Sequence, residues 1–377
     1  MSRKTENHLK ILHIISSGTV GGAEKCFLEM LAASRKTFAG VAAVCSAGGE
    51  LERLAADACD KVYTAAMADN ADVFSLYKLY KIIGEYKPDL CHLHMNRATL
   101  LGALAAKFNK VKSIGSIQGE VRPIYAYFPD YLTFCSKNVA DHVRSRSSAV
   151  ASKPSFYLYN CIDNSALAKL AETGGRAFLR EEFGIPENAF VVCQVARLHQ
   201  NKGHAFLIDA IYKNIGKIPD LYCLIVGAGD KKYEEQLKTQ AENLGISNRF
   251  IFTGLRLDVA RIISGADLFA LPSLQEGIPV TIMEALSLRL PCVAFDVGGI
   301  YELADTAAAS EPFITLVPAR DTEALASAIY NIYANYPHYK SIAQKAGVFM
   351  VKHYDKTKYV NDINAIYRGI NFIAKTR

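Results

Sequence analysis

The sequence contains no tryptophan, no Cys-x-x-Cys pair and no Asp-x-Asp triplet, and its apolar runs are short. Without Cys-x-x-Cys there is no local thiol pair of the kind used for zinc binding or redox chemistry. Without Asp-x-Asp there is no carboxylate pair from which a metal ion could bridge to a diphosphate. No segment approaches the roughly 18 apolar residues of a membrane span, and the N-terminus has too short an apolar core for a signal peptide. A protein that is soluble or peripheral to a membrane is expected.

The nine cysteines are scattered, several of them inside apolar runs, which fits structural thiols in a reducing cytosol. The net charge of +6 is modest and uneven, because residues 1–180 hold 23 basic and 16 acidic side chains. A basic first half could contact an anionic membrane surface or an anionic acceptor, or could simply be a solvated surface. No stripe of basic and aromatic residues appears, so we expect no nucleic-acid partner.

Short apolar runs alternate with segments of helical periodicity along all 377 residues, half of which are hydrophobic. This alternation is typical of parallel sheets covered by helices on both faces, and the length allows two such domains. The sequence therefore predicts an α/β fold with two Rossmann-like, doubly wound domains. The predicted strands are Lys10–Ser16, Val41–Cys45, Lys61–Tyr63, Asp89–His94, Lys112–Ile117, Tyr131–Cys135, Phe156–Tyr159, Phe190–Val195, Leu221–Val226, Arg249–Phe252, Asp267–Leu271, Pro291–Phe295 and Phe313–Val317.

We place the N-terminal domain at residues 1–165, a linker at 166–186, the C-terminal domain at 187–355 and a final helical segment at 356–377. The linker is assigned to the polar, glycine-containing stretch before the strand at Phe190. Ligands of open parallel sheets bind at the carboxyl ends of the strands, and a cleft between two such domains is the expected active site. Candidate residues should therefore follow strands.

The stretch SLQEGIPVTIMEAL, residues 273–286, follows one such strand and leads into an apolar helical segment. If the helix begins near Pro279, Glu276 lies just before it and Glu284 lies inside it, on the same face as Val280. The free N–H groups at the start of a helix attract anions. This stretch could therefore bind a phosphate through its backbone while the two carboxylates bind hydroxyl groups. A solvated glutamate and a capping glutamate are the ordinary alternative.

Two further loops carry chemistry that suits an anion. Arg197 and Lys202 lie five residues apart between a strand and a helix, so both cations can converge on one anion, although loop cations are usually just solvated. After the first strand, Gly21 and Gly22 precede Glu24 in a loop that allows a close backbone approach, and a structural turn is the alternative.

His92 and His94 end the strand DLCHLH and point to one face because they are two residues apart. A metal pair is conceivable, but the sequence shows no third ligand, so a hydrogen-bonded pair at the strand end is favoured over a metal site.

The run LPSLQEGIPVTIMEALSLRLPCVAFDVGG resembles the donor-binding signature of glycosyltransferase family 4, whose members are retaining enzymes of the GT-B fold. The GGAE loop, the Arg-x4-Lys pair and the His-x-His strand end are similar to other segments of that family. The resemblance covers nearly the whole chain and is strongest from Val192 to Gly299.

This resemblance implies transfer of a sugar from a nucleotide-diphosphate sugar to a glycan or lipid-linked acceptor, in polysaccharide or lipopolysaccharide biosynthesis. It implies that Arg197 and Lys202 bind the donor diphosphate and that Glu276 orients the sugar. No metal or other cofactor is implied, and the last helix is expected to cross back to the first domain. The remaining donor residues are Gly22, Gly227, Gly254, Gly277, Ile278, Val280 and Glu284; those of the acceptor or cleft are Gly21, His94 and Gln118.

The chain departs from the family pattern at three places that bear on the site. Gln118 stands where a histidine is common, Ala196 replaces the glycine before Arg197, and Cys161 replaces another glycine. Gln118 can supply only hydrogen bonds, which leaves any histidine contact to the sugar in question. A non-hydrolysing nucleotide-sugar epimerase and a non-catalytic nucleotide-sugar-binding subunit are the alternative functions.

Overall fold

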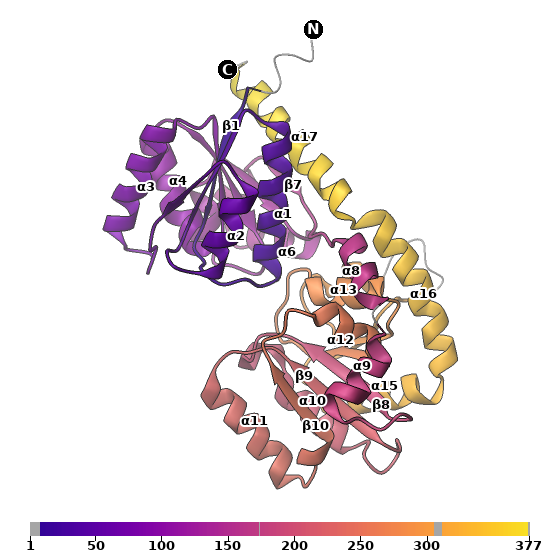
Figure 1. Ribbon diagram of the computed structural model, residues 1–377. Coiled ribbons are helices and arrows are strands. Elements are labelled where there is room, and N and C mark those ends of the chain that lie inside the picture. Colours follow the sequence, from indigo (N-terminus) through magenta and orange to yellow (C-terminus); the bar gives the residue numbers. More distant parts are fainter. Residues whose placement is uncertain (1–7, 173, 305–310, 376–377) are drawn as a thin grey trace. The chain divides into compact units, whose positions relative to one another are not determined.

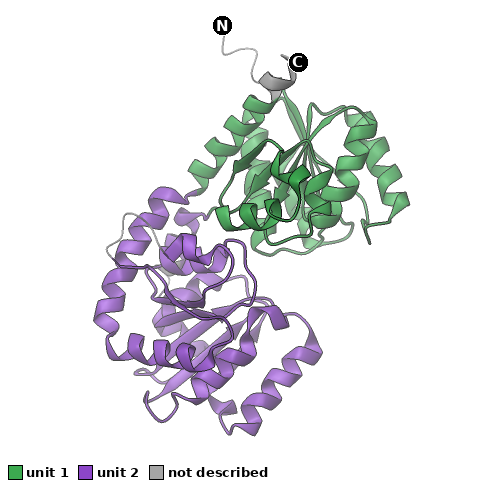
Figure 2. Cartoon of the chain, turned by 180° about the vertical axis from the view of Figure 1, so that it is seen from behind, with its two compact units in different colours: residues 1–161, 356–377 green, residues 162–355 purple. Residues whose placement is uncertain are grey.

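The structure is a computed structural model that describes residues 8–172, 174–304 and 311–375. The chain divides into two compact units, residues 1–161 with 356–377 and residues 162–355 (Figures 1 and 2). Each unit has a parallel sheet with helices on both faces, so the predicted doubly wound α/β architecture is confirmed. Every predicted strand is present, with ends that shift by one or two residues.

Unit 1 contains a seven-stranded sheet in the order β3-β2-β1-β4-β5-β6-β7. The strands are β1 Lys10–Ile15, β2 Gly40–Cys45, β3 Lys61–Thr64, β4 Leu90–His94, β5 Lys112–Ile117, β6 Tyr131–Phe134 and β7 Ser155–Tyr157. The helices are α1 Gly22–Thr37, α2 Glu50–Ala58, α3 Val73–Tyr86, α4 Asn96–Phe108, α5 Ile124–Tyr127, α6 Lys137–Arg144, α7 Ser148–Ala151 and α17 Lys356–Lys375.

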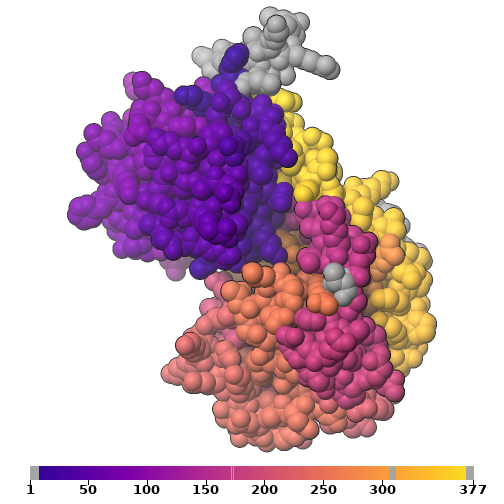
Figure 3. Space-filling view, viewed as in Figure 1, coloured from indigo at the N-terminus to yellow at the C-terminus, as the bar shows by residue number. Residues whose placement is uncertain are grey.

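Both faces of the central strands of unit 1 are buried. Leu12, Ile14, Cys91 and Leu93 share one apolar cluster with α3 and α4, and the alternate residues, His13 and His92 among them, face the other way. Helix α17 packs on α1, so residues from the end of the chain belong to unit 1 (Figure 3). In that view the yellow atoms of α17 lie against the indigo atoms of α1.

Unit 2 contains a six-stranded sheet in the order β10-β9-β8-β11-β12-β13. The strands are β8 Phe190–Val195, β9 Leu221–Val226, β10 Phe250–Gly254, β11 Leu268–Leu271, β12 Cys292–Phe295 and β13 Thr315–Val317. The helices are α8 Asn164–Ala171, α9 Gly175–Phe183, α10 His204–Tyr212, α11 Lys231–Asn243, α12 Val259–Gly265, α13 Val280–Ser287, α14 Ile300–Ala304, α15 Thr322–Ala334 and α16 Tyr336–His353. The strand order reverses between β8 and β11, the position at which open α/β sheets bind ligands.

The predicted linker, residues 166–186, is wrong: this segment forms most of α8 and all of α9, which pack on α12 within unit 2. Phe178 and Leu179 are buried, and Arg176 forms an ion pair of 3.0 Å with Asp267. The polar residues that suggested a linker are therefore the outer face of a docked helix. The units meet at Cys161 and Ile162 in the chain, four residues before the predicted boundary.

Among the described residues, no helix combines the length and the apolar character needed to cross a membrane. This agrees with the short apolar runs in the sequence.

Candidate active site

The centre of the candidate site is an ion pair between Lys202 and Glu276, whose Nζ and Oε1 atoms are 2.6 Å apart. Their side chains are 23% and 10% exposed, so the pair is shielded from water but still reachable. Lys202 ends a short 3-10 turn after β8, and Glu276 lies in the loop after β11. The two residues thus come from the neighbouring strand ends at which the strand order reverses.

Backbone contacts fix the two loops against each other. Leu274 N–H donates to the Asn201 carbonyl at 2.8 Å, and the buried Gln194 amide donates to the Lys202 carbonyl at 2.7 Å. Gly203 has a φ of +70°, and a Cβ there would lie 1.7 Å from the Pro272 carbonyl oxygen. Only glycine allows the loops to approach this closely. Lys202 is therefore held in place from its main chain as well as by Glu276.

The loop after β12 holds the other side of Glu276. Gly298 has a φ of +58°, and a Cβ there would lie 1.8 Å from the Glu276 carbonyl oxygen. The next residue, Gly299, donates its N–H to the Gly277 carbonyl at 2.9 Å. Glu276, in the loop after β11, is thus held at its carboxylate by Lys202 and at its main chain by the loop after β12.

Helix α13 begins at Val280, and Pro279 is its N-cap with extended backbone, one residue outside the position predicted for it. No side chain caps this end, so its first N–H groups point out of the helix. Ile278, Val280 and Glu284 are all buried, with Glu284 only 7% exposed. The uncapped start of α13 thus follows Glu276 by four residues, and the buried Glu284 lies within the helix.

Arg197 lies two residues after the end of β8 and is exposed, and the described residues include no acidic partner within ion-pair distance of it. Its neighbour Ala196 donates its N–H to the Val226 carbonyl at 3.0 Å. Gly227 in turn donates to the Gly254 carbonyl at 2.9 Å. The structure thus brings Arg197, Gly227 and Gly254 to one edge of the sheet of unit 2.

Two polar residues near this site were missed by sequence reasoning. The side chain of Gln194 is completely buried in β8 and positions Lys202. The hydroxyl of Ser273, also completely buried, has no hydrogen-bond partner among the described residues. A polar residue inside the apolar run VVCQV was the one signal for Gln194.

In unit 1, the predicted site residues lie at the carboxyl edge of the sheet. Gly21 is the N-cap of α1 and Gly22 its first residue, both exposed. Glu24 is buried, accepts the Gly21 N–H at 3.1 Å and accepts the Ser17 hydroxyl at 2.8 Å, which closes the loop. His94 ends β4, and Gln118 follows β5, the neighbouring strand. The Oε1 atom of Gln118 is buried with no partner among the described residues.

His92 and His94 have a third histidine beside them. His13 pairs with His92 across β1 and β4, and its Nδ1 lies 3.3 Å from Nε2 of His94. Ligand atoms of all three lie within 4.8 Å of one another, so the group could hold a metal ion. His13 cannot be recognised as a third ligand from the sequence, because it lies 81 residues from His94 in the chain. Only the sheet order places β1 beside β4.

His92 has a hydrogen-bond partner at each ring nitrogen, whereas Nε2 of His13 is buried with no partner among the described residues. The Ser116 hydroxyl lies 2.7 Å from His92 Nε2, and the Tyr367 hydroxyl lies 2.5 Å from His92 Nδ1. In the neutral ring one of these nitrogens donates and the other accepts, and both hydroxyls can take either part. Both nitrogens of His92 are thereby satisfied in the neutral ring. Burial lowers the pKa of His13 to about 3 and the pKa of His92 and His94 well below 6.5.

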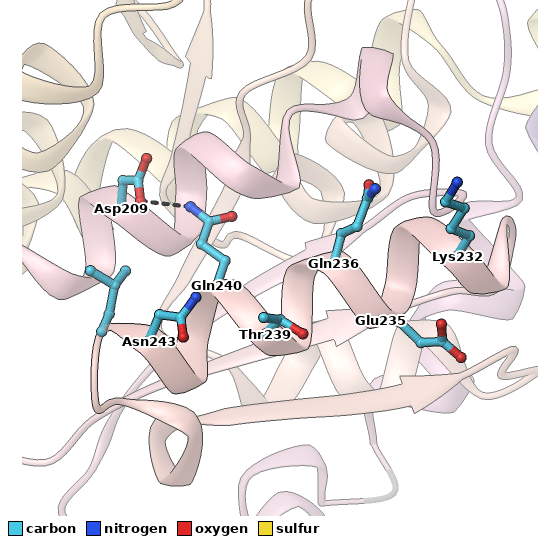
Figure 4. Close-up of a pocket in the computed structure, with 8 residues that line it drawn as sticks. Asp209, Lys232, Glu235, Gln236, Thr239, Gln240 and Asn243 are labelled. Atoms are coloured by element: carbon cyan, nitrogen blue, oxygen red, sulfur yellow. Dashed lines mark hydrogen bonds between the residues drawn. The ribbon is translucent and has the colours of Figure 1, made fainter.

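Two surface cavities lie away from these candidate residues. One, of ≈ 560 Å³, is a polar groove between α10 and α11, in which Gln240 donates to Asp209 at 2.6 Å (Figure 4). The other, of ≈ 590 Å³, lies in unit 1 and is lined by several lysines. Neither is lined by a residue that the sequence predicted for the site.

The chain is similar to known glycosyltransferases. Residues 189–335 match the family model described as glycosyl transferases group 1. The chain is 25% identical over 322 residues to the UDP-Gal:alpha-D-GlcNAc-diphosphoundecaprenol alpha-1,3-galactosyltransferase of Escherichia coli, covering 79% of this chain and 82% of that protein. It is 24% identical to the lipopolysaccharide core biosynthesis mannosyltransferase LpsB of Rhizobium meliloti, covering 49% of this chain and 53% of that protein.

Among solved structures, Anabaena Alr3699/HepE in complex with UDP-glucose is similar, with a TM-score of 0.82 and 22% identity over 96% of this chain and 100% of that one. Fold and relatives together define a glycosyltransferase of the GT-B fold. Within that class, the second unit carries the match to glycosyl transferases group 1. The two relatives are named for transfer to a diphosphoundecaprenol-linked sugar and for lipopolysaccharide core biosynthesis, and the glycosyltransferase activity predicted from the sequence is confirmed.

Proposed function

We propose that this glycosyltransferase moves a sugar from a nucleotide-diphosphate sugar to a glycan or lipid-linked acceptor, with retention of configuration and without a metal ion. The observation that carries the proposal is the Lys202–Glu276 pair at 2.6 Å, beside the uncapped start of α13. It joins a cation for the leaving group to a carboxylate for the sugar. The UDP-glucose complex of HepE and the galactosyltransferase relative, whose name specifies UDP-Gal, support a nucleotide-sugar donor.

The leaving diphosphate develops negative charge as the bond to the sugar breaks. Lys202, Arg197 and the free N–H groups at the start of α13 would bind that charge in place of a metal. Lys202 is already held in position by Gln194 and Glu276, so little reorganisation is required when the charge develops. Removing one such preorganised donor typically costs about 3 kcal/mol, or a hundredfold in rate.

Glu276 would accept hydrogen bonds from hydroxyls of the transferred sugar and stabilise positive charge on its ring. Glu284 would bind the ribose, and Gly227 and Gly254 would flank the nucleotide base. Gly22, Gly277, Ile278 and Val280 complete the proposed donor contacts through their backbones. Gly21, His94 and Gln118 are proposed to contact the acceptor from unit 1. In a retaining reaction of this kind the leaving phosphate takes the acceptor's proton, so no dedicated protein base is required.

The galactosyltransferase relative acts on a diphosphoundecaprenol-linked sugar, as its name states. This supports a lipid-linked acceptor here, and we place the protein at the cytoplasmic face of the membrane that contains such a lipid. We also propose that the protein is a member of glycosyltransferase family 4.

Transfer is tested by incubating the protein with UDP-sugars, with and without lipid-linked or soluble glycan acceptors, in buffer containing EDTA. Nucleoside diphosphate release that depends on an acceptor, and a product with the donor's anomeric configuration by NMR, would support the proposal. Conversion of the donor alone to another nucleotide sugar would identify an epimerase instead. Binding of the donor without conversion of any kind would favour a non-catalytic subunit.

A further inference from the structure

Unit 1 exposes an unusual number of large apolar side chains on one helix. Helix α3 exposes Val73 at 64%, Phe74 at 86%, Tyr77 at 61% and Tyr80 at 41%, while its inner face is buried on the sheet. Phe108, at the end of α4, is 66% exposed. We call these five residues the aromatic ridge. Contiguous exposed apolar surface of this kind marks an interaction site.

The members of the ridge are neighbours in space. Helices α3 and α4 pack side by side, and the Asn109 amide donates to the Tyr80 carbonyl at 3.1 Å (Figure 1). The end of α4, with Phe108, is therefore fixed beside Tyr80. In the space-filling view the purple atoms of α3 form an outer margin of unit 1 (Figure 3).

Lysines accompany the ridge. Lys78 and Lys81 are exposed on α3 itself, and the ammonium of Lys81 lies 5.5 Å from the centre of the Tyr77 ring. Helices with aromatic residues and lysines on their exposed side bind at the boundary between lipid headgroups and acyl chains.

A cavity of ≈ 590 Å³ begins where the ridge ends. We call it the lysine pocket, because it is lined by Lys107, Lys110, Lys112 and Lys153, with Tyr127 and Phe128 as its aromatic wall. Of its lining residues only Asp130 is acidic, and Asp130 is bonded to Lys112 at 3.2 Å. The pocket thus keeps an excess of positive charge.

Lys153 shows the effect of this charge on its own side chain. Its ammonium is partly buried and donates to the Pro129 carbonyl at 2.6 Å. Burial lowers the pKa of Lys153, Asp130 partly offsets this, and Lys107 lowers it further. An anion bound among these lysines would offset the repulsion between the ammonium groups of Lys107 and Lys153.

We propose that the aromatic ridge and the lysine pocket together form a docking surface for an anionic lipid bilayer. The ridge inserts at the level of the headgroups, and the lysine pocket binds a lipid phosphate. Apolar insertion and electrostatic attraction are the two contributions that hold peripheral proteins on membranes, and this surface offers both. The inference extends the proposed lipid-linked acceptor by naming the surface that meets its membrane, and its test does not depend on transfer.

The test is co-sedimentation of the full-length protein with vesicles of phosphatidylcholine, with and without phosphatidylglycerol. One variant removes the ridge, Phe74→Ser with Tyr77→Ser, and another reverses the pocket, Lys107→Glu with Lys110→Glu. All four side chains are exposed, so neither variant is expected to change Tm. Leu257→Ser, at a residue 86% exposed in unit 2, and the exposed pair Lys345→Glu with Lys352→Glu on α16 are the matched controls.

We expect binding that requires phosphatidylglycerol and becomes at least ~10-fold weaker in each test variant, because each lysine near an anionic surface contributes a several-fold factor. The control variants should change vesicle binding by less than ~2-fold. High salt should abolish most of the binding of the ridge variant, which retains only the lysines. Equal binding to both kinds of vesicle, or unchanged binding by both test variants, would overturn the inference.

A second outcome would also overturn it. If the wild-type protein is a dimer by light scattering and the ridge variant is a monomer, the ridge is a contact between two copies of the chain. Loss of vesicle binding with normal transfer to a water-soluble acceptor would support the docking surface. Loss of transfer with normal vesicle binding would count against the proposed function only.

Discussion

The ammonium nitrogen of Lys202 lies 2.6 Å from a carboxylate oxygen of Glu276, across two loops 74 residues apart in the chain. The pair is largely buried, so breaking it leaves a charge without its partner in a poorly solvated place. Lys202→Met should therefore affect both the donor diphosphate and the position of Glu276. We expect transfer to fall at least ~100-fold, measured as acceptor-dependent release of nucleoside diphosphate.

Lys213→Met is the matched control for that substitution. Lys213 pairs with Glu323 at 2.5 Å on the surface of the same unit, away from the strand ends of the site. Pairs of this kind contribute little to stability. Its transfer rate should stay within ~2-fold of the wild type, and a loss as large as that of Lys202→Met would show a general effect of removing lysines.

Glu284 is proposed to bind the donor's ribose, and not the reacting atoms. Glu284→Gln keeps the size of this buried side chain but weakens its hydrogen bonds to hydroxyl groups. We expect the donor KM to rise at least ~5-fold with kcat changed by less than ~3-fold. A large fall in kcat at an unchanged KM would assign Glu284 to the reaction itself.

Stability should fall in acid because of the three buried histidines of unit 1. Their folded-state pKa values are lowered by burial, so below about pH 6.5 the unfolded chain binds protons that the folded chain does not. Each histidine then costs up to about 1.4 kcal/mol per pH unit as the pH falls from 6.5 toward its folded pKa, and nothing above that range. Urea unfolding between pH 4.5 and 8 measures this slope.

The variant His13→Gln should have a shallower slope, because one proton-binding ring is lost from the unfolded chain. His338→Gln, which removes a half-exposed histidine, is measured beside it as the control substitution. Equal slopes for the wild type and His13→Gln would mean that His13 is not neutral and buried as described.

The proposal that transfer needs no metal ion is tested at the cluster of three histidines in unit 1. His13, His92 and His94 form the group among the described residues that could hold a metal ion, but His92 is satisfied by Ser116 and Tyr367. We expect less than ~0.1 transition-metal ion per chain by elemental analysis, because His92 would have to give up a hydrogen-bond partner before its ring could bind a metal. Transfer should also survive EDTA. A full equivalent of zinc that disappears in His13→Gln would contradict this.

The strands could be predicted from sequence because each is a short apolar run bounded by polar residues, and a buried parallel strand requires nothing more. The segment 166–186 could not, because the docked helix α9 buries only one narrow face through Phe178 and Leu179. Its polar side chains give the composition of a linker. The closeness of Lys202 and Glu276 could be predicted from the sequence, because each residue follows a strand at the edge of the sheet where ligands bind.

His13 shows the limit of sequence reasoning. Nothing local distinguishes it from any other residue of a buried strand, and its contact with His94 depends on β1 and β4 being neighbours. Gln194 is a similar case, since its role depends on the hydrogen bond that its side-chain amide donates to the Lys202 carbonyl, eight residues later. Contacts of side chains inside the sheets could not be predicted from the sequence, whereas residues that follow strands could be assigned to the ligand-binding edge.

The central claim is that cations of unit 2 bind the donor's diphosphate without a metal while Glu276 acts on the sugar. Calorimetric titration of UDP in EDTA, into the wild type, Arg197→Met and Glu276→Gln, tests it most directly. We expect binding to the wild type, at least ~10-fold weaker binding by Arg197→Met, and binding by Glu276→Gln no weaker than that of the wild type, because Lys202 then has no carboxylate partner and is available to the diphosphate. If UDP binds only when a divalent ion is added, or binds equally well to Arg197→Met, the claim is contradicted.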